Sequence, residues 1–378
     1  MKKRIYADNA ATTKLSAAAA KAMQIYSSEE YANPSSLHSL GRNSKKILEN
    51  ARKRIAATID AEPSEIYFTS GGTESDNLAL KGSAFCYPFK KKRIITSSIE
   101  HHAILRSTEF LATMGYDIFY LPVDEFGLVN ALDLEKAIND DTVLISVMLA
   151  NNEIGTIEPI FELARIAHKH NIPFHTDAVQ AVGHIPISVK ELGVDMLSAS
   201  AHKFNGPRGV GFLYIRKGTN LTPLMNGGGQ EAGLRAGTEN LPAIMGMTLA
   251  LEESYNKISQ NKDYLLKLEE IILQGLSENN IDYRINGGKE KLPGLISLSF
   301  NGADGEKILH RLDLANICIS TGSACNSREK EISHVLKAIN LEEQYAKGTI
   351  RISLGIDNTE DEAREILNAI LKDAKRFW

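Results

Sequence analysis

The sequence predicts an α/β fold, in which a mostly parallel β-sheet is covered by helices on both faces. Two observations predict this fold. Over roughly the first two-thirds of the chain, short apolar and β-branched runs alternate with longer amphipathic stretches, which is the order of strand–helix units. The expected strands are also nearly continuous in apolar residues, as in sheets that are buried on both sides.

The expected elements follow this alternation along the chain. Between the strands lie segments with the length and the apolar spacing of amphipathic helices. The strands are expected at residues 65–70, 93–98, 118–121, 142–149, 173–177, 196–200 and 209–215, and the helices at 73–87, 103–114, 130–139 and 160–170.

The pattern changes after residue 255, which indicates a second domain. The 378 residues are too many for one ordinary core. We expect a large α/β domain at 15–255 and a small α+β domain formed by 1–14 and 256–378. The small domain contains expected helices at 264–276 and 305–313, expected strands at 295–300, 317–320 and 349–354, and a last helix opened by the capping-box pair Thr359 and Glu362.

Composition excludes several classes of function. A formal net charge of −4, with both signs interspersed, provides no broad basic surface for nucleic acid. The longest apolar runs are far shorter than the roughly 20 residues of a membrane helix, and no signal-peptide core follows the N-terminal basic residues. Three cysteines without metal-ligand spacing favour free thiols in a reducing compartment. We therefore expect a cytoplasmic protein in which Cys86 and Cys318 are buried as small hydrophobic residues.

A glycine-rich turn follows the first strand of the expected sheet. Residues 70–76 read SGGTESD. The two glycines let backbone N–H groups approach a ligand, and Thr73 can cap the following helix while it offers a hydroxyl. Because a helix N-terminus carries positive potential, this segment suits a phosphate group. An ordinary glycine turn with a helix cap is the alternative.

Three polar residues follow the ends of other expected strands. A buried carboxylate at Asp177 needs a cation, such as a protonated pyridine nitrogen, although a helix cap is also possible. Partial burial of Lys203 would lower its pKa and favour the neutral amine of a Schiff-base lysine, whereas most lysines are solvated. The imidazole of His101 could lie over an aromatic cofactor, or serve only structure. Together with the phosphate site, these are the parts that pyridoxal 5′-phosphate requires.

Matching motifs along nearly the whole chain carry a resemblance to a known family. They are residues 6–13 (YADNAATT), 33–38, 72–77, 100–102, 151–155, 175–180, 200–203, 206–209, 237–238, 323–325 and 351–355. In these motifs the chain resembles the cysteine desulfurases of the NifS/IscS group. That group lies within the class V aminotransferase family, whose members are fold-type I pyridoxal-phosphate enzymes with a seven-stranded, mostly parallel sheet.

The resemblance implies a role for each matching residue. Lys203 would hold the cofactor as a Schiff base, Asp177 would pair with the ring nitrogen, and His101 would stack on the ring and act in catalysis. Arg351 would bind the carboxylate of the substrate. The other implied contacts are Gln180 and Asn152 at the ring, Gly72, Thr73, Ser200 and His202 at the phosphate, Thr238 at the phosphate from the other subunit of a homodimer, and Asn33 and Asn152 at the substrate.

Cys325 separates a desulfurase from an aminotransferase. Its neighbours in residues 320–327 are small and polar, which favours a mobile, exposed loop. The resemblance implies that L-cysteine becomes L-alanine while the Cys325 thiolate takes the sulfur as a persulfide. The persulfide would then serve a sulfur-acceptor protein, either an iron–sulfur scaffold or a tRNA-thiolation carrier.

Several alternatives stay open. A class V aminotransferase of the same fold would have no use for Cys325, a selenocysteine lyase would follow the same path with selenium, and a non-catalytic scaffold subunit would keep only the fold. The chain ends at Trp378, without the longer tail on which a scaffold docks in other members of the group, so the acceptor stays open. Gly72 and Ala236 replace the alanine and serine of many relatives, and we expect only slight changes at the phosphate.

Overall fold

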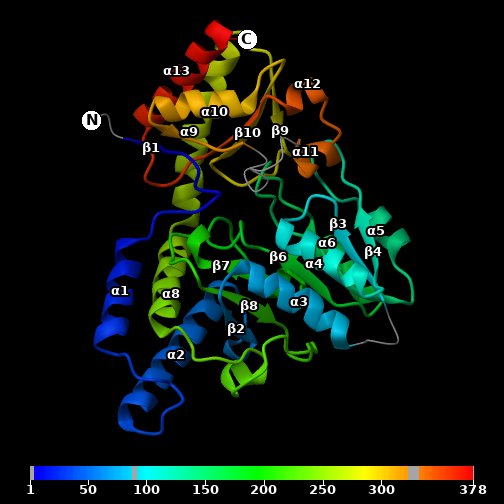
Figure 1. Cartoon of the computed structure of the whole chain (residues 1–378), viewed down its shortest axis with the longest axis vertical. Coiled ribbons are helices and arrows are strands. Elements are labelled where there is room, and N and C mark those ends of the chain that lie inside the picture. The colour runs from blue at the N-terminus through cyan, green and yellow to red at the C-terminus, as the bar shows by residue number, and fades with distance from the viewer. Residues whose placement is uncertain (1–3, 87–91, 322–331, 378) are drawn as a thin grey trace.

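A seven-stranded sheet forms the centre of the larger part of the molecule (Figure 1). The computed structural model describes residues 4–86, 92–321 and 332–377. The strands from β7 to β4 are parallel, and β8 runs antiparallel to both of its neighbours. The predicted α/β fold is therefore confirmed. The strand order is β2 (Ile66–Thr69), β8 (Gly211–Ile215), β7 (Met196–Ser200), β6 (Phe174–Asp177), β5 (Thr142–Ser146), β3 (Arg93–Ser97) and β4 (Asp117–Leu121).

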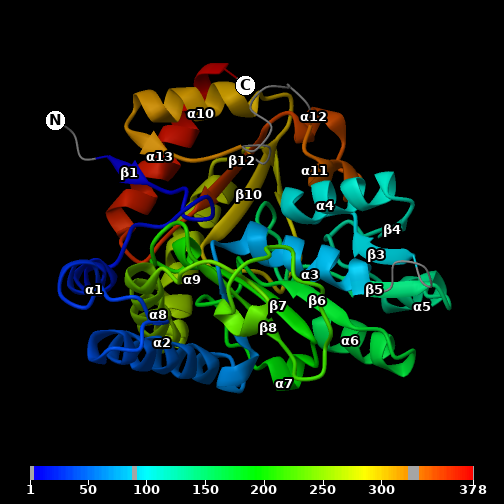
Figure 2. The ribbon, with the colours of Figure 1, turned by 60° about the horizontal axis from the view of Figure 1, so that its bottom comes forward.

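Helices cover both faces of this sheet because its strands are apolar on both sides. Successive side chains of a strand point to opposite faces. In β7, Met196 therefore joins a cluster with the helices α3 and α4, whereas Leu197 joins the cluster on the other face. Figure 2 shows the two layers. The helices are α3 (Gly72–Cys86) and α4 (His102–Thr113) on one face, and α2 (Ser39–Thr58), α5 (Ala131–Ala137), α6 (Ile160–Lys169) and α8 (Leu241–Tyr255) on the other.

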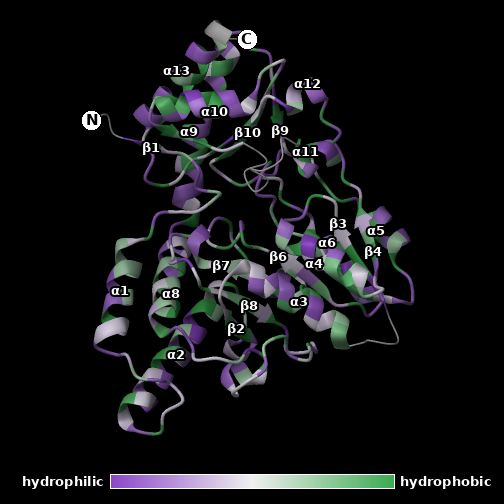
Figure 3. Cartoon of the chain, in the orientation of Figure 1, coloured by the Kyte–Doolittle hydropathy of each residue, from purple (hydrophilic) through white to green (hydrophobic). Residues whose placement is uncertain are grey.

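A second, antiparallel sheet lies in the C-terminal part of the chain. Its order is β12 (Thr349–Ser353), β10 (Leu295–Phe300), β9 (Tyr283–Asn286). A separate apolar cluster joins this sheet to the helices beside it. Figure 3 shows hydrophobic and hydrophilic residues on the same helices, as expected where one helix face meets the core and the other meets water. The helices are α9 (Ile258–Glu278), α10 (Gly305–Leu314) and α13 (Glu360–Phe377).

The N-terminal segment crosses to this second part. Strand β1 (Ile5–Tyr6) pairs in parallel with β11 (Ile317–Cys318), and Asp8 forms a bridge with Ser353. The segment that follows β1 is thereby held between the two sheets. The predicted cap of the last helix is also present, since Glu362 N–H donates to Thr359 Oγ1 and Thr359 N–H donates to Glu362 Oε2, both at 3.2 Å.

Several local predictions were incomplete or wrong. Helix α3 begins at Gly72, so Thr73 lies in its first turn and does not precede it as a cap. Cys86 and Cys318 are half-buried rather than buried. No described helix is long and apolar enough to cross a membrane. The elements that the pattern did not predict are α1 (Ala17–Ser28), α2, α7 (Val189–Leu192), α8, α11 (His334–Ala338), α12 (Glu343–Ala346), β1, β9 and three short 3₁₀ turns at 63–65, 201–203 and 230–233.

Candidate active site

A cavity of about 630 Å³ opens where the parallel strands end. Strand carboxyl ends are the usual ligand-binding edge of such sheets. Residues of the N-terminal segment and of the second sheet close the cavity from the other side. The predicted site residues that line it are Gly72, Thr73, His101, Asn152, Asp177, Gln180, Ser200, His202, Lys203 and Arg351.

Three predicted site residues are not among those that line the cavity. Asn33 is exposed in the segment between α1 and α2, where its Oδ1 accepts a hydrogen bond from Ser35 N–H at 2.8 Å. Thr238 is exposed in the segment that precedes α8. Cys325 lies outside the described residues.

The glycine-rich turn forms one wall of the cavity. Gly71 has φ +146°, a backbone conformation that side chains rarely adopt. A Cβ atom on Gly72 would lie 2.5 Å from Cγ2 of Val179, so the close approach of α3 to the β6 loop favours glycine there. Helix α3 points its N-terminus at the cavity, and its free N–H groups suit an anion.

Lys203 lies on the 3₁₀ turn directly after β7. Its Nζ donates to the carbonyl oxygens of Ala10 at 2.6 Å and Ala11 at 3.0 Å. Gln180 Nε2 donates to the same Ala10 oxygen at 2.9 Å. The N-terminal segment therefore fixes both side chains. His202 lies beside Lys203, and burial with the nearby lysine charge lowers the pKa of His202 to about 4.

Two buried carboxyl groups lie side by side on the floor of the cavity. Asp177 ends β6, and Asp76 projects from the first turns of α3. Burial raises the pKa of both groups, while the hydrogen bond that Val179 N–H donates to Asp177 Oδ1 opposes the rise at Asp177. This bond resembles a local cap, although residues 179–184 form turns and no helix begins there. Asp76 Oδ1 is also buried without a hydrogen-bond partner among the described residues, so the pair of acids must either carry a proton or face a cationic group.

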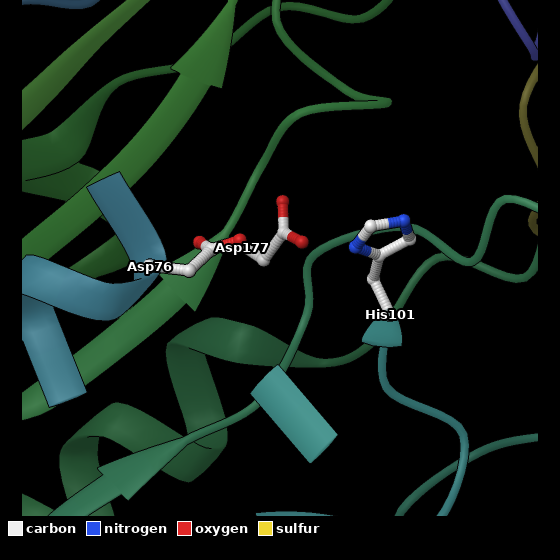
Figure 4. Close-up of side chains that lie close together, drawn as sticks. All are labelled: Asp76, His101 and Asp177. Carbon is white, nitrogen blue, oxygen red and sulfur yellow. The ribbon is translucent and has the colours of Figure 1, made fainter. Parts of the chain in front are cut away.

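His101 faces these acids across the cavity (Figure 4). One ring nitrogen of His101 and one carboxylate oxygen of each of Asp76 and Asp177 lie within 4.8 Å of one another. Ala103 N–H donates to Nδ1 of His101 at 3.1 Å, and burial lowers the pKa of His101 to about 4. The ring is therefore neutral, with its proton on Nε2. A metal ion would also suit this spacing. Metal binding would not, however, account for Lys203 and the glycine-rich turn, which line the same cavity.

Arg351 enters the cavity from β12 of the second sheet. It is only 4% exposed. Its Nη1 donates to the carbonyl oxygen of Asn152 and its Nη2 to Asp8 Oδ1, each at 2.9 Å. Its Nε has no hydrogen-bond partner among the described residues. A buried guanidinium that retains an unused donor is suited to bind a carboxylate.

Sequence reasoning missed several acids and neighbours that line the cavity. Burial raises the pKa of Glu100 to about 8 and that of Glu153 to about 7, and both side chains border the cavity. Ser333 donates to Glu153 Oε2 at 2.6 Å, and His334 bonds to the carbonyl oxygen of Glu100 at 2.9 Å. The local signals were the position of Glu100 directly before His101 and that of Glu153 directly after Asn152, both within the matching motifs. Ser333 and His334 reach the site through tertiary packing and had no such signal.

A lysine, an acid and a glycine-rich anion turn at the strand ends of such a sheet define the class of enzymes that hold pyridoxal phosphate. Residues 5–366 match the aminotransferase class-V family, and the chain belongs to this family. It is 50% identical over 371 residues to "Cysteine desulfurase IscS" of Dictyoglomus turgidum, covering 98% of this chain and 94% of that protein.

Two solved structures are also similar to the chain. One, titled "NIFS-LIKE PROTEIN", has a TM-score of 0.92 at 40% identity, covering 98% of this chain and 99% of the other. The second, titled "SspA in complex with cysteine", has a TM-score of 0.82 at 38% identity, covering 93% of this chain and 99% of the other. The similarity thus extends to a protein that was solved with cysteine bound.

Proposed function

We propose that the protein is a cysteine desulfurase that uses pyridoxal 5′-phosphate. It converts L-cysteine to L-alanine and transfers the sulfur to Cys325. The observation that carries the proposal is that Lys203, Asp177 and the glycine-rich turn line one cavity together with a buried arginine, Arg351. Membership of the class-V family and the likeness to a cysteine-bound protein support it.

The cofactor would be held by residues from several loops of the sheet domain. Lys203 would bond covalently to its aldehyde carbon, Asp177 would pair with its ring nitrogen, and His101 would lie against the ring. The buried carboxyl group of Asp177 and the glycine at position 72 fit such a group, because they leave an acidic floor beside a narrow anion turn. When bound, pyridoxal phosphate stabilises negative charge at Cα of an amino acid. The remaining contacts are Gln180 and Asn152 at the ring, and Gly72, Thr73, Ser200, His202 and Thr238 at the phosphate.

The residues of the chain itself then bind and orient the substrate. Arg351 binds the carboxylate of L-cysteine, which fixes the amino acid at the end of the cavity near Asn152. Asn33 is proposed as a further substrate contact. The neutral amine of Lys203 would act as the general base that removes the Cα proton, because a base must lie within reach of the proton that it removes. Neutral His101 carries its proton on Nε2, where it can donate to the substrate or the cofactor.

Sulfur transfer uses the Cys325 thiolate. The thiolate attacks the substrate sulfur, the carbon–sulfur bond breaks, and the carbon receives a proton. One thiol and one cysteine thus yield one persulfide and one alanine, with all atoms balanced. The persulfide then passes to an acceptor protein, which is either an iron–sulfur scaffold or a thiolation carrier.

The experiment that tests this function measures alanine from L-cysteine without any keto acid. An aminotransferase would need the keto acid, and a scaffold subunit would form no alanine. Cys325→Ser should keep the visible absorbance of the bound cofactor and lose persulfide formation. Lys203→Ala should lose covalent attachment, so that borohydride fixes no cofactor on the protein. Persulfide in Cys325→Ser, or a colourless wild type with excess cofactor, would overturn the proposal. A selenocysteine lyase would show a strong preference for selenocysteine over cysteine in the same assay.

Assembly and location complete the proposal. We propose a homodimer in the cytoplasm, with a large domain at 15–255 and a small domain formed by 1–14 and 256–378 that carries Cys325. Thr238 is exposed and does not line the cavity of its own chain, so a role at the phosphate requires a second copy. Light scattering of the purified protein tests the dimer, and a monomer with bound cofactor would remove Thr238 from the site.

A further inference from the structure

Asp76 is a buried acid that lines the cavity, and the proposed function assigns it no role. It is 1% exposed, and its Oδ1 has no hydrogen-bond partner among the described residues. Its carboxyl group lies next to that of Asp177, on the side away from His101 (Figure 4). A buried carboxylate without a partner is costly, so either a cation or a proton must stabilise it.

Among the described residues, none that acts on Asp76 supplies a cation. His175 Nε2 is 3.8 Å from Asp76 Oδ1, but burial lowers the pKa of His175 to about 3, so its ring is neutral. Its two nitrogens lie 2.8 Å from Ser146 Oγ and 3.0 Å from Ser198 Oγ. The other titratable neighbour that acts on Asp76, apart from Asp177, is Glu100, which burial keeps mainly protonated at neutral pH because its pKa is about 8. Asp76 therefore faces neutral or acidic groups.

Asp177 has the better surroundings for the charged form. Val179 N–H donates to it at 2.9 Å, and the positive charge of Lys203 also favours its ionised state. For Asp76, burial and the charge of Asp177 both raise the pKa well above its usual range, against a hydrogen bond from Ser198. Two adjacent buried carboxyl groups share one proton, and here the proton belongs on Asp76.

We propose that Asp76 is a positioning residue that remains protonated beside Asp177 and so keeps the negative charge of the floor on Asp177, facing the ring nitrogen of the cofactor. Asp76 acts through Asp177, beside which its carboxyl group lies. This inference rests on the proposed function, because it assigns the cation on the floor to pyridoxal phosphate. It predicts that an uncharged hydrogen-bonding side chain can replace Asp76.

The test compares Asp76→Asn with Asp76→Leu, two side chains of similar size. Asparagine reproduces the neutral, polar acid, so its affinity for pyridoxal phosphate should stay within about twofold of the wild type. Leucine removes the polar group, and the loss of one hydrogen-bonding group next to a charged acid corresponds to a loss of affinity on the order of 10-fold. ¹⁵N NMR of ring-labelled cofactor should show the protonated nitrogen in the wild type and Asp76→Asn, and a shift toward the unprotonated form in Asp76→Leu.

A second measurement does not depend on whether Asp76→Leu folds. The infrared difference spectrum of wild type minus Asp76→Asn at neutral pH should contain the carbonyl band of a protonated carboxyl group. An ionised-carboxylate band in its place, or equal NMR shifts for Asn and Leu, would overturn the inference. Failure of the wild type to bind the cofactor at all would instead overturn the proposed function.

Discussion

The floor and the rim of the cavity differ in how the chain builds them. The floor consists of residues at the ends of consecutive strands, such as Asp177 and Lys203, and backbone groups from neighbouring residues or from the N-terminal segment hold them. The rim includes Arg351, whose partners Asp8 and Asn152 are 343 and 199 residues away in the sequence. The floor therefore follows from local sequence and sheet topology, whereas the rim exists only when the second sheet docks.

The largest effect is expected on the floor, from Asp177→Asn. In the proposed function this change removes the charge that pairs with the ring nitrogen, so alanine formation should fall by about 10²- to 10³-fold, as for the loss of one group that stabilises developing charge. The measurement is the rate of alanine formation at saturating cofactor. Thr176→Val is the matched control, because Thr176 lies next to Asp177 on β6 and its buried hydroxyl has no hydrogen-bond partner among the described residues. Equal rates of alanine formation in Asp177→Asn and Thr176→Val would show that the charge of Asp177 does not contribute to catalysis.

At the rim, Arg351→Lys should weaken substrate binding more than turnover. Lysine keeps the positive charge but loses the planar fork that contacts Asp8 and Asn152. We expect KM for L-cysteine to rise by about 10- to 100-fold, the value of one or two hydrogen bonds between charged groups, while the cofactor absorbance stays unchanged. Arg311→Lys is the control, since Arg311 pairs with Asp373. A similar rise of KM in Arg311→Lys would point to general destabilisation of the second sheet.

The burial of Glu100 beside the cavity should also affect the pH dependence of stability. Burial raises the pKa of Glu100 from 4.5 to about 8 in the folded protein. The folded state thus binds more protons than the unfolded state between these values, so this stabilising contribution is complete below pH 4.5 and is lost as the pH rises through about 8. Each pKa unit corresponds to about 1.4 kcal/mol.

Glu100→Gln should flatten that pH dependence. Glutamine stays neutral, so its thermal unfolding midpoint should fall less than that of the wild type as the pH rises from 4.5 to about 8. Glu109→Gln, at an exposed acid on α4, is the control and should follow the wild type. Parallel curves for Glu100→Gln and the wild type would show that Glu100 is already ionised and hydrated at neutral pH.

The same contrast explains what the sequence could predict. Asp177, Lys203 and the glycine-rich turn each follow a recognisable strand, so their meeting at one sheet edge was predictable and is confirmed by the lining of one cavity. Asp76 lies within the helix that follows the glycine-rich turn, and only the packing of that helix on β6 makes it a neighbour of Asp177. No local pattern carries that information.

Missed helices have a related cause. Helix α8 is apolar over most of its surface and buries nine of its residues, so it lacks the polar stripe by which amphipathic helices are recognised. Helices α1 and α2 pack against α8, and their place in the fold depends on that contact. The inward residues of α1, Ala19 and Ala22, are small and give a weak hydrophobic signal.

The smallest effect is expected from Gly72→Ala at the phosphate turn. The added methyl group would lie 2.5 Å from Val179 Cγ2, so Val179 must move, and overpacking of this kind costs about 1–3 kcal/mol when the site is rigid. Val179 is only half-buried, which lets it yield, and we expect cofactor affinity to fall by less than about 10-fold. The double variant Gly72→Ala with Val179→Ala should recover the affinity, because the second change removes the clashing atom. If the double variant does not regain its affinity for the cofactor, the clash with Val179 is not the cause of the loss. The turn would then need glycine for its backbone conformation rather than for space.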